Sequence, residues 1–238
     1  MTTQWRATGP FIASSALFTG ILDETQLFLQ TYAEQEGSVD TRVANAKQLL
    51  VESLLPQRSR ASRKSIVERI SRRLISWNPP AWVLDDLALF AAQSSLLALK
   101  SALLLHVCRQ DQLLYALVLE VVVPKWSERQ TGIDSADVQR FLDGQLPQRP
   151  EIENWTRQTR ERLGGTTLSL LRDYGLLQGR TNKQIVEPIV PDEVVRHVVR
   201  LLREEGISEE EIPSHPDWRL WLWNEERTRG VLSELTIG

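Results

Sequence analysis

The residues of this chain that are suited to binding an anion lie close together in one short stretch. Between Arg58 and Arg73 the sequence holds seven basic residues and a single acid, Glu68. Arginine and lysine neutralise phosphate groups, and the interspersed serines can donate hydrogen bonds to phosphate oxygens. An ordinary exposed helix mixes charges of both signs, so this imbalance favours polyanion binding over simple solvation. The candidate contacts are Arg58, Arg60, Arg63, Lys64, Arg69 and Arg72.

A second basic stretch follows about a hundred residues later. Between Arg157 and Lys183 there are six basic residues against two acids. The candidate contacts here are Arg157, Arg162, Arg172, Arg180 and Lys183. The rest of the chain is acidic and the formal net charge is only -3. We therefore expect two local basic patches on a molecule that would otherwise repel polyanions.

Other chemistries find little support in the residue pattern. The three histidines are far apart and none forms a ligand-spaced pair, so we expect no metal site. Carboxylates are adjacent at 85–86 and 209–211, but neighbours on a helix do not converge on one point. The only cysteine, Cys108, lies in an apolar run and is expected to be a small core residue. With no phosphate-binding glycine loop either, we expect no enzyme, no cofactor and no small-molecule substrate.

An all-α fold must position the basic residues, because apolar side chains return every three or four positions along most of the chain. The first basic stretch predicts an amphipathic helix over 59–74, capped by Ser59 or Ser62. Its apolar face leaves Lys64, Arg69 and Arg72 outside. Further helices are predicted over 23–34, 40–54, 80–92, 94–109, 111–125, 135–142 and 155–174, with another opening at Pro191.

The apolar region 87–123 predicts buried core helices and not membrane spans. Charges at Lys100, Arg109, Asp111 and Glu120 interrupt it before an uncharged stretch reaches the ~20 residues that a bilayer requires. The N-terminus lacks the pattern of a signal peptide, and a single cysteine suits a reducing compartment. We therefore expect a soluble, cytoplasmic protein that does not contact the membrane.

The second basic stretch has the order of a winged helix-turn-helix module. The predicted helix 155–174 ends at Gly175 and leads into a short hairpin, the wing, near 176–189, with 135–142 as the supporting helix. Arg162 and Ser169 would then be candidates for contacts with base edges. The alternative is a simple helical packing corner. A boundary at 147–150 would divide an N-terminal helical subdomain, 1–146, from a C-terminal one, 147–238.

Several stretches resemble BrxA of the bacteriophage exclusion (BREX) defence systems. The most specific is LLPQRSRASRK at 54–64, and the others lie at 117–122, 133–155 and 170–177, so that the resemblance covers about Leu17 to Glu205. It implies an all-helical cytoplasmic protein with two helix-turn-helix elements beside positive patches, which binds double-stranded DNA without enzymatic activity. It also implies partners, the methyltransferase and ATPase components of the same system. One departure is Gly164-Gly165, a pair that permits a kink where helix formers are expected.

The residues and the resemblance together favour a non-enzymatic, duplex-DNA-binding accessory protein that acts mainly through phosphate contacts. Two alternatives stay open. The basic helices could dock on acidic surfaces of other defence proteins, or the protein could bind RNA. The tail with Trp218, Trp221 and Trp223 lies outside the resemblance, and its role is not predicted.

Overall fold

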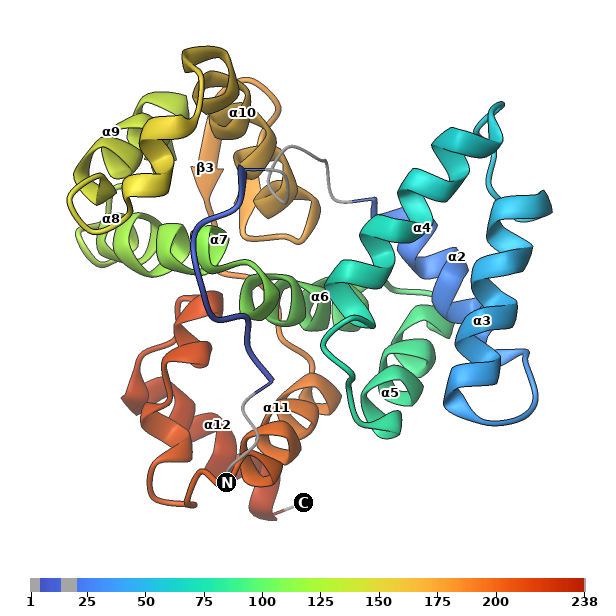
Figure 1. Ribbon diagram of the computed structural model, residues 1–238. Coiled ribbons are helices and arrows are strands. Elements are labelled where there is room, and N and C mark those ends of the chain that lie inside the picture. Colours follow the sequence, from blue (N-terminus) through green and yellow to red (C-terminus); the bar gives the residue numbers. More distant parts are fainter. Residues whose placement is uncertain (1–4, 14–20, 238) are drawn as a thin grey trace.

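The chain is organised around one buried helix, α6 (Leu97–Gln110), which runs through the centre of the molecule (Figure 1). The structure is a computed structural model that describes residues 5–13 and 21–237. From Ala98 to Arg109 nearly every side chain of α6 is buried, as its apolar sequence predicts. Helices α4, α5, α7 and α11 and the 3-10 helix η5 all contact it. The predicted all-α fold with a short hairpin is confirmed.

On one side of α6 lies a layer built from the first third of the chain (Figure 1). It contains α2 (Leu22–Ala33), α3 (Val39–Leu49), its π-helical continuation η1 (Leu50–Leu54), α4 (Arg60–Leu74) and α5 (Ala81–Ala92). The predicted helix 40–54 is therefore one continuous rod that changes its hydrogen-bond pattern near its end. The predicted basic helix is confirmed to within one residue.

On the other side lie the helices that carry the second basic stretch. They are α7 (Gln112–Leu117), η2 (Val118–Val122), α8 (Val123–Ser127), α9 (Ser135–Gln145), the 3-10 turn η3 (Pro150–Asn154) and α10 (Arg157–Asp173). A capping box begins α9. The Asp134 side chain accepts a hydrogen bond from the Asp137 amide, and the Asp137 side chain accepts one from the Asp134 amide. Helix α9 packs directly against α10.

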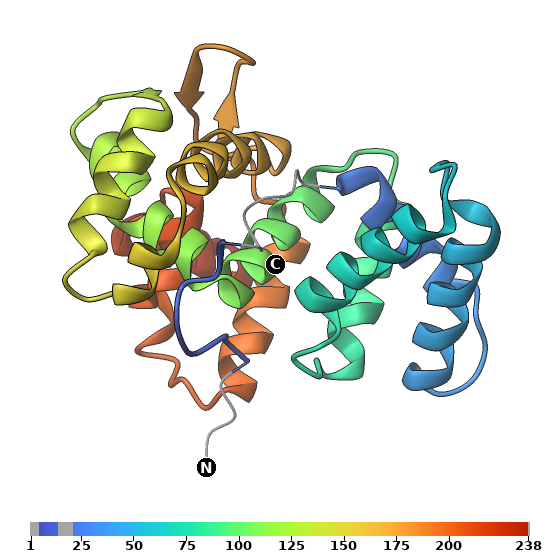
Figure 2. The same cartoon turned by 45° about the horizontal axis from the view of Figure 1, so that its top comes forward.

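A small antiparallel sheet completes this part of the molecule (Figure 2). Its strands β1 (Gly132–Ile133), β2 (Leu177–Gln178) and β3 (Lys183–Ile185) are ordered β1-β3-β2. The hairpin β2–β3 is the predicted wing, and its turn requires Gly179, where φ is +88° and a Cβ would lie 2.2 Å from the Asn182 carbonyl oxygen. Strand β1 was not predicted, because two residues carry no detectable alternation.

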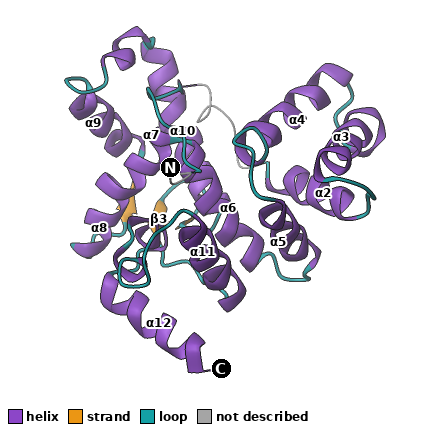
Figure 3. Ribbon diagram, turned by 60° about the horizontal axis from the view of Figure 1, so that its bottom comes forward, coloured by secondary structure: helices purple, strands orange, loops and turns teal. Residues whose placement is uncertain are grey.

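The C-terminal quarter forms a third unit beside α6, shown in Figure 3. It contains α11 (Asp192–Glu204), the 3-10 turns η4 (Ile212–Ser214) and η5 (Pro216–Trp221), and α12 (Glu225–Ile237). The three tryptophans of the tail, Trp218, Trp221 and Trp223, are buried with ring centroids 5.8 to 6.3 Å apart. The tail is therefore part of the core.

Buried ion pairs fasten this unit to α6 and to the N-terminal segment. Arg109 of α6 pairs with Glu205, and its Nε lies 3.1 Å from Asp217 Oδ2. Asp217 also binds Arg6, whose Nη2 lies 2.6 Å from Oδ1, and accepts a hydrogen bond from the Tyr115 hydroxyl at 3.0 Å. Removing one charge from such a buried network leaves another unpaired, which is strongly destabilising.

Elements on the two sides of the predicted boundary at 147–150 contact each other. Strand β1 lies before it and pairs with β3, which lies after it, and α9 packs on α10 across it. One continuous hydrophobic cluster includes residues from both sides. Among the described residues, no single helix has the length and apolarity to cross a bilayer. Only α6 and the α7–α8 rod taken together are long and apolar enough, and the chain bends by 110° between them.

Candidate nucleic-acid interface

The basic helix α4 forms because its sequence separates apolar from charged side chains. Ser59 begins it by accepting a hydrogen bond from the Ser62 amide at 3.1 Å. The buried face consists of Ile66, Val67, Ile70 and Leu74, and α4 packs on α6. This packing fixes which of the basic residues reach solvent.

Four basic side chains of this stretch are exposed: Arg58, Arg60, Lys64 and Arg72. We call them the α4 patch. Within the described part of the chain, no carboxylate oxygen lies within ion-pair distance of any of them. Their charges are therefore available to an external anion.

Arg63 has a structural role that the sequence did not predict. Its Nε donates to the Val51 carbonyl oxygen at 2.6 Å, and its Nη1 donates to the carbonyl oxygens of Gln57 at 2.7 Å and Arg58 at 3.4 Å. The guanidinium thus satisfies carbonyls at the end of η1 and in the loop that leads to α4. Arg63 therefore holds the α3–α4 connection together, and its contact with phosphate stays a prediction.

Arg69 and Arg73 lie toward the interior edge of α4. Arg69 is half-buried, and its Nη2 donates to Ser65 Oγ at 3.1 Å. Burial and the neighbouring charges of Arg73 and Arg72 lower the pKa of Arg69. Arg73 Nη1 donates to the Tyr174 hydroxyl at 3.4 Å and so links α4 to the end of α10. Arg69, although predicted as a contact, is therefore not part of the α4 patch.

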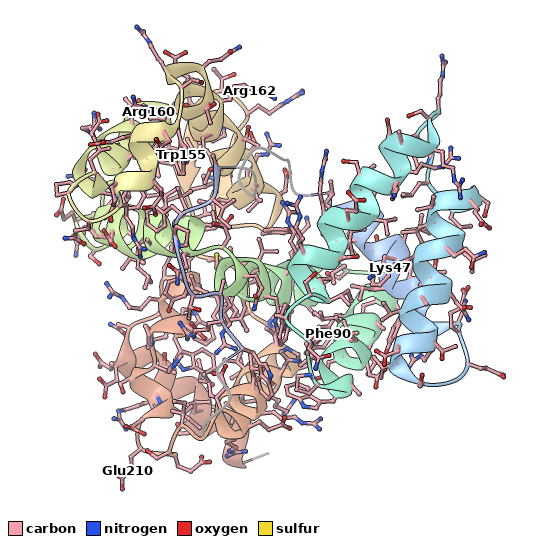
Figure 4. All side chains as sticks on the ribbon, viewed as in Figure 1. Lys47, Phe90, Trp155, Arg160, Arg162 and Glu210 are labelled. Carbon is pink, nitrogen blue, oxygen red and sulfur yellow. The ribbon has the colours of Figure 1, made fainter. Side chains whose placement is uncertain are left out.

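The α4 patch borders a groove of about 1020 Å³ between α3 and α4. Arg60, Lys64 and Arg72 line it from α4, and Lys47 lines it from α3, where Figure 4 labels it. Partial burial lowers the pKa of Lys47. Two acids, Glu52 and Glu68, also line the groove, so its charge is positive but mixed. The sequence did not single out Lys47, because the residue lies outside any basic run.

In the second basic stretch, α10 presents the predicted residues unequally. Arg162 is exposed, and among the described residues it has no ion-pair partner. Arg157 pairs with Glu161 one turn away, at 2.7 Å, and Arg172 pairs with Asp173 at 2.8 Å. Both pairs are at least partly exposed, so each contributes little stability, and an incoming phosphate could compete for the arginine.

The wing adds two basic residues next to α10. Arg180 is exposed at the tip of the hairpin, and Lys183 is half-buried in β3 with its Nζ donating to the Arg180 carbonyl oxygen at 3.1 Å. We call Arg157, Arg162, Arg172, Arg180 and Lys183 the α10 patch. Arg162 and Arg180 are its exposed members without an ion-pair partner among the described side chains.

The two patches lie on different sides of α6, and α4 runs from the edge that α10 also reaches down toward α6. Figure 1 places both α10 and the loop that leads to α4 at its upper edge, and Figure 2 places the wing and that loop likewise. Figure 4 shows Arg162 near this edge and Glu210, in the acidic C-terminal unit, at the opposite end. Residues 192–234 hold eleven acids and six basic residues. The C-terminal unit is therefore acidic, and Glu210 in it lies at the opposite end from Arg162.

The sequence profile of the BrxA family matches residues 19–201, which is well over half of the chain. The chain belongs to the BrxA family. Membership implies a role in BREX phage defence. The crystal structure of an uncharacterized protein from Magnetospirillum magneticum resembles this BrxA-family protein with a TM-score of 0.64 and 17% sequence identity, over 90% of this chain and 100% of that one. This likeness concerns the fold alone. A search of curated proteins gave no match.

The histidines of this BrxA-family protein are closer in space than in sequence. His106 Nε2 lies 2.8 Å from His197 Nε2, and His197 Nδ1 lies 2.8 Å from Asp86 Oδ2. This pairing is buried among α5, α6 and α11 and lies away from both patches. Within the ranges 5–13 and 21–237, no three His, Cys, Asp or Glu side chains are grouped so that they could hold a metal ion. Cys108 is buried as expected, and burial raises the pKa of its thiol.

Proposed function

We propose that this BrxA-family protein binds double-stranded DNA through phosphate contacts, as a non-enzymatic accessory component of its BREX system. The observation that carries the proposal is the α4 patch. Four exposed basic side chains follow one another along the α3–α4 groove and its entrance without a carboxylate partner among the described residues. A surface that only needed solubility would pair these charges, as α10 does with Arg157 and Glu161.

The surroundings of the α10 patch support a duplex as the ligand. Helices α9 and α10, followed by the wing, have the order of a winged helix-turn-helix module, in which the second helix enters the major groove. Here α10 keeps Leu163, Leu168 and Leu171 in the core and turns Gln158 and Arg162 outward. The tip of the wing carries Arg180 beside it. Among the described residues that line the α3–α4 groove there is no aromatic side chain on which a single-stranded base could stack.

The charge distribution supports an oriented encounter with DNA. The acidic C-terminal unit is repelled by phosphate, whereas the edge with α10 and the loop before α4 is attracted to it. A polarised molecule of this kind approaches a polyanion with one face, so the two patches would reach DNA together. The predicted partners, the methyltransferase and ATPase components of the system, would then find the acidic end accessible.

The salt dependence of binding tests the proposal. A variant with Arg60→Ala, Lys64→Ala and Arg72→Ala removes three phosphate contacts, so the slope of log K against log salt should become shallower by about 2.7. The matched control is Arg196→Ala, Arg203→Ala and Arg229→Ala in the C-terminal unit, which removes the same charge far from the patches. Fluorescence-anisotropy titration of a labelled duplex at several salt concentrations measures both.

Equal slopes for the parent and the α4-patch variant would refute this interface. If the parent protein released DNA at physiological salt, docking on acidic protein surfaces would be the better account of the basic residues. Competition between the duplex and a structured RNA completes the test, because stronger binding of the RNA would favour an RNA ligand.

A further inference from the structure

Two adjacent glycines in the middle of α10 have different surroundings. A Cβ at Gly164 would lie 3.2 Å from the Ser135 Cβ and 3.5 Å from the Ser135 carbonyl oxygen. This is tighter than ordinary contact, so Gly164 is explained by the close packing of α9 on α10. At Gly165 a Cβ would meet nothing within 4 Å. No packing against residues 5–13 or 21–237 therefore requires a glycine at 165.

A glycine within a helix destabilises it by about 1 kcal/mol relative to alanine. Helix α10 is nevertheless continuous from Arg157 to Asp173, and the kink that the glycine pair permits does not interrupt it. Because Gly165 lies in no turn and has no close neighbour among the described residues, contacts within that part of the chain do not explain why a glycine stands there.

The position of Gly165 on α10 suggests an explanation. It lies on the outward face, three residues after Arg162 and seven before Arg172, so these three share one side of the helix. The hydroxyl groups near it turn back on the helix, since Thr166 Oγ1 donates to the Arg162 carbonyl oxygen at 2.8 Å and Ser169 Oγ to that of Gly165 at 2.9 Å. The surface of α10 around Gly165, between Arg162 and Arg172, therefore carries only short side chains. The two arginines are about 15 Å apart along the helix axis.

We propose that Gly165 is the point at which a DNA duplex comes into direct contact with the backbone of α10, with Arg162 and Arg172 binding phosphates on either side. This rests on the proposed function and adds how the helix is seated. Ser169 uses its hydroxyl hydrogen internally, so the contact depends on shape and backbone approach more than on base edges. A side chain at 165 should lift the duplex off the helix, whatever the DNA sequence.

Openness alone does not distinguish this glycine, because Gly230 in α12 also has nothing within 4 Å of its Cβ position. Gly230 lies in the C-terminal unit, away from both patches, and so provides a matched control. Gly165→Ala and Gly230→Ala should both fold and should be at least as stable as the parent. In anisotropy titrations, Gly165→Ala should bind duplex DNA about tenfold more weakly, the scale of forcing a methyl group into a packed contact. Gly165→Gln should bind more weakly still, and Gly230→Ala like the parent.

The outcomes separate this inference from the proposed function. If Arg162→Ala weakens binding but Gly165→Ala and Gly165→Gln do not, the duplex does not reach the α10 backbone, and the proposed function stands. If the Gly165 variants lose affinity for one duplex sequence and not for an unrelated one, the contact is base readout and the shape argument is overturned. If the parent binds no DNA, the proposed function itself fails.

Discussion

Arg63 offers a direct way to separate structural from DNA-binding roles within one helix. In Arg63→Ala the carbonyls of Val51 and Gln57 lose charged donors at 2.6 and 2.7 Å. Hydrogen bonds to charged groups each contribute ~1.5–3 kcal/mol, and the half-buried position places these toward the lower end, so the loss should be about 3 kcal/mol. For a chain of this size that lowers the melting temperature by roughly 6 to 12 °C. The exposed Arg60→Ala should change stability by less than about 0.5 kcal/mol.

Urea denaturation followed by circular dichroism measures the stability difference, and duplex titration of the folded proteins measures DNA affinity. Arg60→Ala should lose affinity and keep its stability, whereas Arg63→Ala should lose stability. Arg63→Lys should recover only part of it, because an ammonium cannot bridge two carbonyls in the geometry of a guanidinium. If Arg63→Ala were as stable as the parent and lost as much DNA affinity as Arg60→Ala, the structural role assigned to Arg63 would be refuted.

Two further predictions concern the buried ionic groups. Asp217→Asn should lower the free energy of unfolding by about 3 kcal/mol, because it leaves the buried Arg109 with one carboxylate fewer; Glu225→Gln in an exposed pair is the control, and equal urea midpoints would contradict the prediction. Stability should also fall on acidification: burial lowers the pKa of His215 from 6.5 to about 4, so the unfolded chain takes up a proton first as the pH drops through that window. At about pH 5 the loss from this group is about 2 kcal/mol, and His106, whose pKa is also lowered by burial, acts in the same direction. A urea midpoint that stayed constant from neutral pH to about pH 5 would show that these histidines do not titrate on unfolding.

The helices were predicted well from the sequence because each has local signals, namely a capping residue, an apolar face and a residue that ends it. The basic helix has a serine cap, an apolar face and a clear stop, and it was placed to within one residue. The wing was predicted because Gly175 and Gly179 signal a helix end and a tight turn, and both have positive φ. Strand β1 was missed because two residues leave no periodic trace, and its partner β3 lies about fifty residues away.

The candidate site was predicted less completely because charge along the sequence does not say where a side chain points. Arg63 stands among exposed basic residues but binds three backbone carbonyls. Lys47 stands alone in sequence yet faces the same groove as Arg60. Only the packing of α3 against α4 reveals either, and this packing depends on contacts distant in the chain. The boundary at 147–150 stays a prediction; the pairing of β1 with β3 across it could not be read from loop composition.

The two patches can act together only if α6 keeps the helices that carry them at fixed positions relative to each other. Helix α6 contacts both α4 and α7, and Arg109 near its end is locked to Glu205 and Asp217 from the C-terminal unit. Each patch alone offers few phosphate contacts, and binding through one of them raises the effective concentration of DNA at the other. This gain in affinity is lost when the two patches are no longer held at fixed positions. The buried tail, with its tryptophans and Asp217, thus contributes to DNA affinity in this proposal without touching DNA, by holding α6 in place between the α4 and α10 patches.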